Sequence, residues 1–460
     1  MMLGQILQPE IKDLINSRDF SSLKEVLLDW TPADIADLLS DLPDYEQAIL
    51  FRIIPKDIAT DTFEYLDVDV QLSLLKALGN EEVAFILNDM SPDDRTAMLE
   101  EVPASVLKQM MSLLSVKERH VAQSLLGYPE NSVGRLMTPD YLAIRENWTV
   151  QEVLNYIRTH GKDIETLNII YITNEKGKLI DDIKIGEFLL APLELSVNEL
   201  MDGNFTYLQV FDDQEKAVEV FKKYDRIALP VTDSSGILVG IVTVDDVLDV
   251  AEEEATEDFQ KLGAVEALEE SYADIPLLQM IKKRAGWLSV LFIGELFTAS
   301  AMGFFENEIS KAVVLALFVP LIISSGGNSG SQAATLVIRA LSLGEVSIRD
   351  WFFVMKRELL SGLILGAILA VLGFLRITLW QNFSGMYGPH WLLIAFTVSV
   401  ALIGVVMWGT LMGSMLPLGL KKIGFDPAAS SAPFVATLVD VTGLMIYFSI
   451  ALLLLKGTLL

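Results

Sequence analysis

The sequence predicts a multidomain membrane protein with an all-α superhelical N-terminal domain, a duplicated α/β domain, a connecting helix and five transmembrane α-helices. Three observations predict this: a twelve-residue repeat, a second and looser duplication, and five long apolar stretches in the C-terminal part. A chain of 460 residues is long enough for about three domains, each with its own core. We expect domains at 1–130, 131–250, 251–280 and 281–460.

Charge and hydropathy divide the chain in the same way. The apolar fraction of 52% and mean hydropathy of +0.42 are high for a chain with 21% charged residues, and the apolar residues gather after position 285. Residues 281–460 hold 8 acids and 12 bases, a net charge of +4, which leaves −32 for residues 1–280. Such an acidic part cannot bind nucleic acid through counterion release, but it attracts cations.

Residues that bind soft metals are scarce. The chain has no cysteine, and its three histidines, His120, His160 and His390, are too scattered for a zinc site. The N-terminus lacks a basic segment followed by a long apolar one, so we expect no cleavable signal and an acidic half that stays in the cytosol.

The twelve-residue repeat divides Thr31 to Leu114 into seven consecutive units. Apolar residues fill the ninth and twelfth positions of every unit, which predicts one short helix per unit and a stacked superhelical solenoid. No catalytic motif occurs here, so a plain scaffold is the alternative to a functional role. The ninth and twelfth positions are Leu39, Phe51, Phe63, Leu75, Leu87, Leu99 and Met111, and Leu42, Ile54, Leu66, Leu78, Met90, Val102 and Leu114.

The second duplication covers residues 131–195 and 196–250. In each copy a helix is followed by an apolar strand, a glycine turn at Gly177 or Gly236, a second strand and another helix. The copies resemble two CBS modules, a family whose members pair through their sheets. The second ends in GILVGIVTVDDVLDV, close to the family pattern, whereas the first has DDIKIGEFLL where a strand leading to an Arg-Asp pair is usual.

Residues 251–280 are polar and helix-forming, and we expect a connecting helix here, with a solvated linker as the alternative. Five stretches long and apolar enough to span a bilayer follow, at about 286–305, 312–338, 359–380, 391–418 and 433–455. With the N-terminus inside, nine basic residues flank the cytosolic ends and three the opposite ends. We therefore expect an inner-membrane protein with its C-terminus outside.

Polar residues and helix breakers interrupt the second span, VPLIISSGGNSGSQAATLVIRA. Asn328, Ser331 and Gln332 lie at membrane depth, where such groups are tolerated when protein shields them or when they line a wet cavity. The alternative is close helix packing, because Gly326 and Gly330 form a GxxxG pair.

Asp440 lies inside the fifth span, with no basic residue in the same segment. A charge at this depth costs about 2.5 to 3.5 kcal/mol on insertion scales, so Asp440 should face a cavity or a cation. Proteins commonly hold Mg²⁺ through one or two carboxylates plus water. A two-fold axis would double Asp440 and, with Asn328, Ser331 and Gln332 nearby, bind a largely hydrated Mg²⁺.

Three motifs resemble the MgtE family of magnesium channels: P-x5-GGN-x-G-x-Q from Pro320 to Gln332, FDPA at 425–428, and P-x2-ATL-x-DVTG around Asp440. The domain order is also similar, so the resemblance covers essentially the whole chain. It implies a homodimeric channel, not an enzyme, in which Asp440 holds the transported Mg²⁺. Some relatives have asparagine where Ser331 stands, which would reshape the wall beside the ion.

The resemblance also implies a sensor in which cytosolic Mg²⁺ bridges acidic residues and holds the pore shut. Each acid has a plainer alternative: Asp93 suits a helix first turn, Asp426 before Pro427 suits an N-cap, and residues 252–258 suit a solvated face. The sensor candidates are Asp61, Asp93, Glu215, Asp225, Asp246, Asp249, Glu254, Glu257, Asp258 and Asp426.

Adenine nucleotide is a further candidate ligand, because paired CBS modules often bind it. Asp245 in VTVDDV is the natural ribose partner, and Arg226 stands where some relatives have an aromatic residue that stacks on the base. ATP and Mg²⁺, both transported and regulatory, are therefore the expected ligands.

Two rival functions remain open. A channel of the same build could carry Co²⁺, Mn²⁺ or several divalent ions, although the pore has no histidine or cysteine for softer metals. An ion-coupled exchanger could use Glu295 in the first span as a proton carrier, with an interhelical hydrogen bond as the plainer role. A membrane protease is excluded, because no histidine lies within a span.

Overall fold

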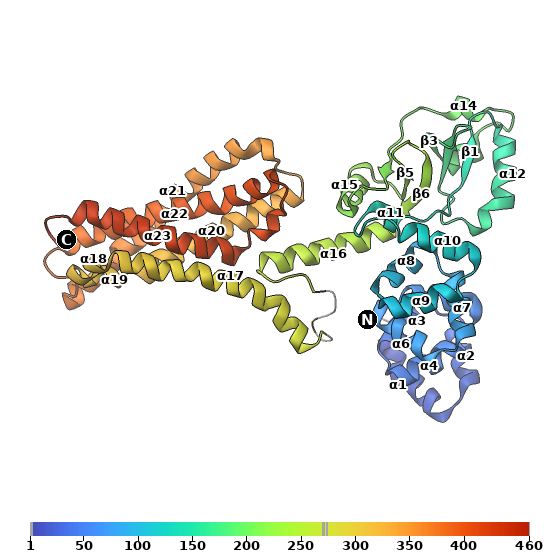
Figure 1. Ribbon diagram of the computed structural model, residues 1–460, viewed down its shortest axis with the longest axis horizontal. Coiled ribbons are helices and arrows are strands. Elements are labelled where there is room, and N and C mark those ends of the chain that lie inside the picture. The colour runs from blue at the N-terminus through green and yellow to red at the C-terminus, as the bar shows by residue number, and fades with distance from the viewer. Residues whose placement is uncertain (1–2, 269–271, 273–274, 460) are drawn as a thin grey trace. The chain divides into compact units, whose positions relative to one another are not determined.

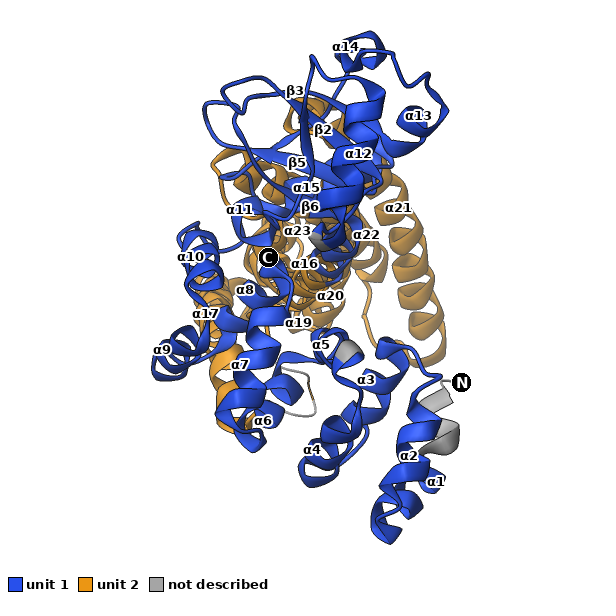
Figure 2. Cartoon of the chain, turned by 90° about the vertical axis from the view of Figure 1, so that its right-hand side faces the viewer, with its two compact units in different colours: residues 1–252 blue, residues 253–460 orange. Residues whose placement is uncertain are grey.

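The computed structural model describes residues 3–268, 272 and 275–459 (Figure 1). It divides into two compact units, residues 1–252 and 253–460, which Figure 2 colours separately. The division falls inside one helix, α16 (Val244–Leu262), whose first half belongs to unit 1 and whose last turns belong to unit 2.

Unit 1 begins with a stack of short helices that confirms the predicted solenoid (Figure 1). The seven helices α3 to α9 start at twelve-residue intervals, from Pro32 to Ala104. The helices are α1 (Leu3–Ser17), α2 (Phe20–Leu27), α3 (Pro32–Ser40), α4 (Asp44–Ile53), α5 (Lys56–Glu64), α6 (Val68–Ala77), α7 (Asn80–Asp89), α8 (Pro92–Glu101), α9 (Ala104–Leu113) and α10 (Val116–Leu125).

The repeat is longer than the sequence analysis recognised. Helices α2 and α10 keep the same spacing, at Phe20 and Val116. Leu27 and Trp30 continue the apolar pattern into the α2 unit. In the α10 unit the ninth position is the polar Gln123, so the pattern does not identify that unit as a repeat. The ninth-position side chains from Leu39 to Leu99 are buried in one continuous core along the stack.

The duplicated domain contains two three-stranded sheets of identical topology, and each pairs a short parallel strand and a longer antiparallel one with its central strand. Gly177 and Gly236 adopt positive φ in the two hairpin turns, as predicted. The elements are α11 (Val133–Leu136), β1 (Ala143–Arg145), α12 (Val150–His160), η1 (Gly161–Asp163), β2 (Ile169–Thr173), β3 (Leu179–Lys184), α13 (Ile185–Leu190), α14 (Val197–Leu200), β4 (Leu208–Gln209), α15 (Gln214–Tyr224), β5 (Ala228–Thr232) and β6 (Leu238–Thr243).

The two modules exchange their first turns. Val133 and Met137, at the start of the first sequence copy, are buried in the core of the second module. Val197, at the start of the second copy, is buried in the core of the first. The backbone N–H of Gly134 donates to the Val210 carbonyl, and a side chain on Gly134 would collide with that oxygen. The modules are therefore interlocked.

The described residues of 251–280 do not form the single connecting helix that we expected; 269–271 and 273–274 lie outside the described part of the chain. Helix α16 continues directly from the second CBS module and ends at Leu262, where Gly263 follows and Ala264 adopts positive φ. The N–H of Val265 closes this end by donating to the Gln260 carbonyl, a typical helix C-terminal motif. The next helix, α17, begins after Pro276.

The described residues of unit 2 contain five helical segments long and apolar enough to span a membrane: 277–304, 313–342, 348–384, 391–422 and 432–455. They confirm the predicted five-helix transmembrane domain. The elements are α17 (Leu277–Phe304), α18 (Glu306–Lys311), α19 (Val313–Ala316), α20 (Val319–Ser342), η2 (Ile348–Asp350), α21 (Trp351–Ser384), α22 (Trp391–Lys422), η3 (Pro427–Ala429) and α23 (Ala432–Leu455).

Glycine pairs bring α20 and α22 together. Gly326 and Gly330 do not break α20 but face Gly409 and Gly413, which share the same four-residue spacing on α22. A Cβ on Gly413 would lie only 2.0 Å from the Gly330 carbonyl oxygen, so only glycine fits. The glycines of the second span therefore serve close helix packing, the alternative raised from the sequence.

Replacing Gly413 with alanine should destabilise unit 2, because the added methyl group must push two backbones apart. Overpacking of this kind costs about 1 to 3 kcal/mol. Gly419→Ala is the matched control, since nothing lies within 4 Å of a Cβ at that position of α22. Thermal unfolding in detergent measures the difference; equal unfolding temperatures for the two variants would contradict the packing described.

Candidate functional site

Asp440 lies on α23 where that helix meets α20. A Cβ on Gly327 would lie 3.4 Å from Asp440 Oδ1, so the carboxylate rests against a backbone that carries no side chain. Val439, the preceding residue, is buried against Gly326. The carboxylate itself is half-buried, and Glu295 of α17 lies within electrostatic range. Two acids from two helices therefore approach each other at membrane depth.

The polar residues of α20 have different surroundings. Asn328 and Gln332 are exposed in the single chain and, four residues apart, lie on one face of the helix. The Asn328 amide donates to Ser324 Oγ over 3.3 Å. Ser331 instead donates to the carbonyl oxygen of Ala432, 3.0 Å away, and so joins α20 to the start of α23. The Ser331 hydroxyl hydrogen is therefore engaged in this contact between the two helices.

A group of carboxylates, here called the acid cluster, lies where the solenoid meets the CBS modules within unit 1. Asp93 is in electrostatic range of Asp94, Glu165 and Asp246, and Asp94 is in range of Asp245 and Asp249. Glu64 joins them from α5. The acid cluster comprises Glu64, Asp93, Asp94, Glu165, Asp245, Asp246 and Asp249.

Burial makes ionisation of these groups costly. Asp93 is 7% exposed, and within the described part of the chain its Oδ1 has no hydrogen-bond partner. Burial, reinforced by Asp246, raises the pKa of Asp93 well above its ordinary value. Burial also raises the pKa of Glu64 and of Asp246 to about 7, although Ser91 and Thr243 donate hydrogen bonds to them. The acid cluster therefore resists full ionisation at neutral pH unless a cation offsets the charge.

Among the residues that the structure describes, no lysine or arginine forms an ion pair with the acid cluster. Nor do three of these acids surround a common position that could hold a metal ion, as far as the described residues go. The donors are all carboxylate oxygens, which suit Mg²⁺, and Asp93 offers an unpartnered one. An ion would have to draw the carboxylates closer together.

The structure brings only some of the predicted sensor acids together. Asp93, Asp246 and Asp249 meet in the acid cluster, and Asp61 lies at its edge, in range of Glu64. Glu215 and Asp225 instead occupy the two ends of α15. Roughly 15 Å of helix separates these two, so they cannot bind one ion together.

The remaining sensor candidates lie in unit 2. Asp258 accepts a hydrogen bond of 3.0 Å from Ser342, at the end of α20. Glu257 and Asp426 both form ion pairs with Lys261, and Glu254 lies one turn earlier on α16. Asp426 also caps η3 by accepting from the Ala428 N–H, as the plainer interpretation predicted. Asp93 likewise occupies the first turn of α8.

Several cluster residues escaped the sequence analysis. Asp94 adjoins Asp93 in SPDDR and could have been included with it. Glu64 and Glu165 lie in a different helix and a different module, so only the tertiary fold brings them near. Lys261 follows Glu257 by four residues, a helical ion-pair spacing that was visible in the sequence.

The two proposed nucleotide contacts are engaged elsewhere. Arg226 forms an ion pair of 2.8 Å with Asp182 of β3, whose side chain is 1% exposed. Asp245 lies in the acid cluster, where Asp94 and Glu165 would repel a triphosphate. Tyr171 is buried near this ion pair, and in the described chain its hydroxyl has no partner. As placed, these residues do not fit an adenine nucleotide.

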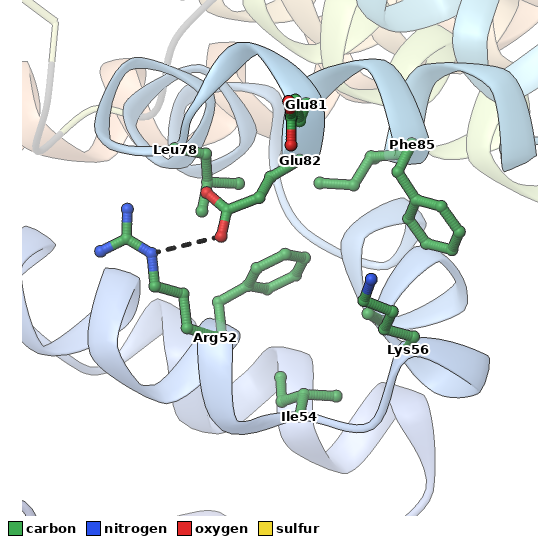
Figure 3. Close-up of a pocket in the computed structure, with 10 residues that line it drawn as sticks. Arg52, Ile54, Lys56, Leu78, Glu81, Glu82 and Phe85 are labelled. Atoms are coloured by element: carbon green, nitrogen blue, oxygen red, sulfur yellow. Dashed lines mark ion pairs between the residues drawn. The ribbon is translucent and has the colours of Figure 1, made fainter.

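A separate pocket of about 190 Å³ opens in the solenoid between α4, α5 and α7 (Figure 3). Phe51, Ile54 and Phe85 line its apolar part. Arg52 reaches Glu82 across the rim in an ion pair of 3.5 Å, and Lys56 lies over the Phe85 ring. Because lysine and arginine balance the two rim glutamates, this pocket has no preference for a cation.

Five apolar helices that follow a CBS pair are typical of a membrane transporter. Family models agree: residues 319–450 match the divalent cation transporter domain of MgtE, 30–131 the MgtE intracellular N domain, and 133–192 and 197–253 the CBS domain. The chain belongs to the MgtE family, whose members are transporters rather than enzymes.

Curated relatives match nearly end to end. The magnesium transporter MgtE of Thermus thermophilus is 37% identical over 98% of this chain and 99% of its own length. The Bacillus subtilis protein of that name is 31% identical over 94% of this chain and 93% of its own. The Enterococcus faecalis protein, also 31% identical, covers 72% of this chain and 70% of its own.

Solved structures match the soluble part. The cytosolic domain of the Mg²⁺ channel MgtE, in complex with ATP, aligns over 53% of this chain and 100% of its own, with a TM-score of 0.51 and 34% identity. The soluble part of a magnesium transporter, 23% identical, aligns over 55% of this chain and 99% of its own, also at 0.51. Both confirm the fold of the N-terminal and CBS domains.

Stability around the acid cluster should fall as pH rises in buffer without divalent ions. A carboxyl whose pKa is raised on folding stabilises the fold below its unfolded pKa, about 4, and loses that contribution by its folded pKa. For Glu64 and Asp246 that value is about 7. We expect the opening free energy of α8 and α16, from hydrogen exchange corrected for intrinsic rates, to fall between pH 5 and 7 and then level.

Asp246→Asn removes one of these titrations and should flatten the fall, whereas Asp69→Asn, at an exposed position of α6, should leave it unchanged. An opening free energy that rises with pH, or the same slope in Asp246→Asn as in wild type, would contradict the assignment.

Proposed function

We propose that this protein is a Mg²⁺-selective channel that imports magnesium and is closed by cytosolic Mg²⁺. The observation that carries the proposal is the membrane carboxylate of Asp440 in a chain whose relatives are named magnesium transporters. The positive-inside bias supports a cytosolic N-terminus and an outside C-terminus in a bacterial-type inner membrane. We propose domains at 1–130, 131–250, 251–280 and 281–460, with α16 crossing the boundary at 250.

In the proposed pore, a homodimer places one Asp440 from each subunit at the dimer axis. Mg²⁺ sheds its water reluctantly, so two carboxylates suffice to hold it through its hydration shell. Asn328 and Gln332 are exposed in the single chain and share one face of α20, so they are available to hydrogen-bond that shell. Ser331 contributes through packing against α23, with its remaining lone pairs available to water.

In the proposed sensor, cytosolic Mg²⁺ binds the acid cluster and offsets the repulsion among its carboxylates. Asp93 and Asp246 are the first ligands, because burial raises the pKa of both and they lie within electrostatic range of each other. Asp249 and Asp61 extend the site, while Glu215 and Asp225 would need separate ions. Asp245, Asp246 and Asp249 all lie on α16, so ion binding would fix the helix that continues into unit 2.

The rival functions make different demands on Glu295. A broader divalent channel needs only Asp440, whereas an exchanger requires a carrier such as Glu295, which lies in electrostatic range of Asp440. A related cytosolic domain is known in complex with ATP. In this chain, contact between Arg226 and ATP would require Arg226 to leave Asp182. We therefore treat nucleotide as secondary to Mg²⁺ in this chain.

Asp440→Asn should abolish Mg²⁺ uptake and Asp440→Glu should impair it, while both proteins still insert as dimers. Asparagine removes both charges from the axis, and glutamate lengthens each arm and displaces retained water. Uptake into a strain without its own magnesium transporters measures both variants. Glu295→Gln is the control: a channel should tolerate it, and an exchanger should not. Wild-type uptake by Asp440→Asn would place the selective site elsewhere.

Asp93→Asn combined with Asp246→Asn should weaken inhibition by internal Mg²⁺, because the closed state loses its buried ligands. The shift should be at least roughly tenfold, the effect of about 1.4 kcal/mol. Mg²⁺ flux into proteoliposomes, at several internal Mg²⁺ concentrations, measures it against Asp67→Asn combined with Asp69→Asn, which removes the same number of carboxylates at exposed positions at the start of α6. Unchanged inhibition would remove the acid cluster from the sensor.

A further inference from the structure

Lys261, in the last turn of α16, lies between two carboxylates of unit 2. Its Nζ is 2.7 Å from Asp426 Oδ2 and also forms an ion pair with Glu257 on the preceding turn. Burial alone would lower the pKa of Lys261, but the hydrogen bonds to Asp426 and Glu257 outweigh it and raise the pKa above the ordinary value. The ammonium therefore stays charged at any physiological pH.

The position of Asp426 is fixed independently of the lysine. Its Oδ1 accepts a hydrogen bond of 2.8 Å from the Ala428 N–H and so caps η3, the turn that leads into α23. Oδ2 is left for Lys261. The ion pair therefore ties the last turn of α16 to the start of the helix that carries Asp440.

Two neighbouring contacts hold the same turn. Ser342, at the end of α20, donates to Asp258. Leu262 packs against the apolar cluster that contains Ile338, Ala428 and Val439. Val439 immediately precedes Asp440, so the end of α16 rests on the two helices that position the membrane carboxylate.

We infer that Lys261 is a built-in cation that holds the end of α16 against the segment between α22 and α23 without a divalent ion. The inference rests on the proposed closure by cytosolic Mg²⁺ and divides the sensor in two. The acid cluster lacks a compensating side chain among the described residues and responds to Mg²⁺, whereas Glu257 and Asp426 already share a protein cation. Lys261 is thus a positioning residue for closure.

The two halves of α16 differ in whether a protein cation compensates their acids. Its first half carries Asp245, Asp246 and Asp249 in the uncompensated acid cluster. Its last turns carry Glu257 beside Lys261, and a Mg²⁺ ion could bridge Glu257 to Asp426 only by displacing the ammonium. The lysine lowers the amount of ion binding that closure needs.

The test measures the internal Mg²⁺ concentration for half-inhibition in the full chain, in wild type, Lys261→Met and Lys261→Arg. Lys261→Met removes both ion pairs and should raise this concentration roughly two- to fivefold, the size expected for ion pairs near the surface. Lys261→Arg keeps the charge and should stay near wild type. Lys222→Met, an equal charge loss at an exposed position of α15, is the matched control and should not shift it.

A lower half-inhibitory concentration in Lys261→Met would overturn the inference, because it would mean that the lysine blocks a Mg²⁺ site. An unchanged concentration would overturn it as well. In the Asp426→Asn background, Lys261→Met should have a smaller effect, which a general loss of structure would not produce. An equal effect in both backgrounds would remove the ion pair from the explanation.

A second readout is independent of transport. In EDTA, hydrogen exchange of residues 258–262 should be faster in Lys261→Met than in wild type or Lys261→Arg, since the contact needs no divalent ion. If wild-type flux ignores internal Mg²⁺ yet exchange changes as expected, the proposed sensor fails and the lysine contact stands. Equal exchange in all three proteins would contradict the contact itself.

Discussion

Repulsion among the carboxylates of the acid cluster, with Asp93 buried at its centre, is the interaction that a cytosolic cation would relieve. Asp93 and Asp246 lie within electrostatic range of each other with no ion pair to balance them in the described chain, and burial raises the pKa of both. A divalent ion is the simplest remedy, because it supplies two charges without needing a side chain. The cluster includes the first turns of α16, whose last turn contacts the helices around Asp440.

In the membrane unit, glycines allow the Asp440 carboxylate to lie close to helix backbone, because they leave the space beside it free of side chains. Gly326 and Gly330 let α20 approach α22, and Gly327 leaves room for the Asp440 carboxylate. A larger residue at Gly327 would meet that carboxylate directly. Close packing and the proposed pore therefore depend on the same short segment, so the GxxxG pair and a pore role are compatible interpretations.

Local patterns in the sequence predict most of the fold. The twelve-residue repeat predicts α3 to α9, and hydropathy predicts the five spans, because both depend on neighbours along the chain. The exchange of Val133 and Val197 between modules has no local signature, and neither has the pairing of Arg226 with Asp182. For the site, Asp93 and Asp246 followed from resemblance, but Glu165 joined them only through tertiary contacts.

We propose that the membrane unit forms a channel and that Mg²⁺ on its cytosolic face closes it. Single-channel recording from excised inside-out patches, with Mg²⁺ as the only permeant cation, tests it most directly. We expect discrete openings whose frequency falls as Mg²⁺ on the cytosolic face increases. Mg²⁺ flux without unitary currents, dependent on a gradient of protons or sodium, would contradict it and favour an exchanger.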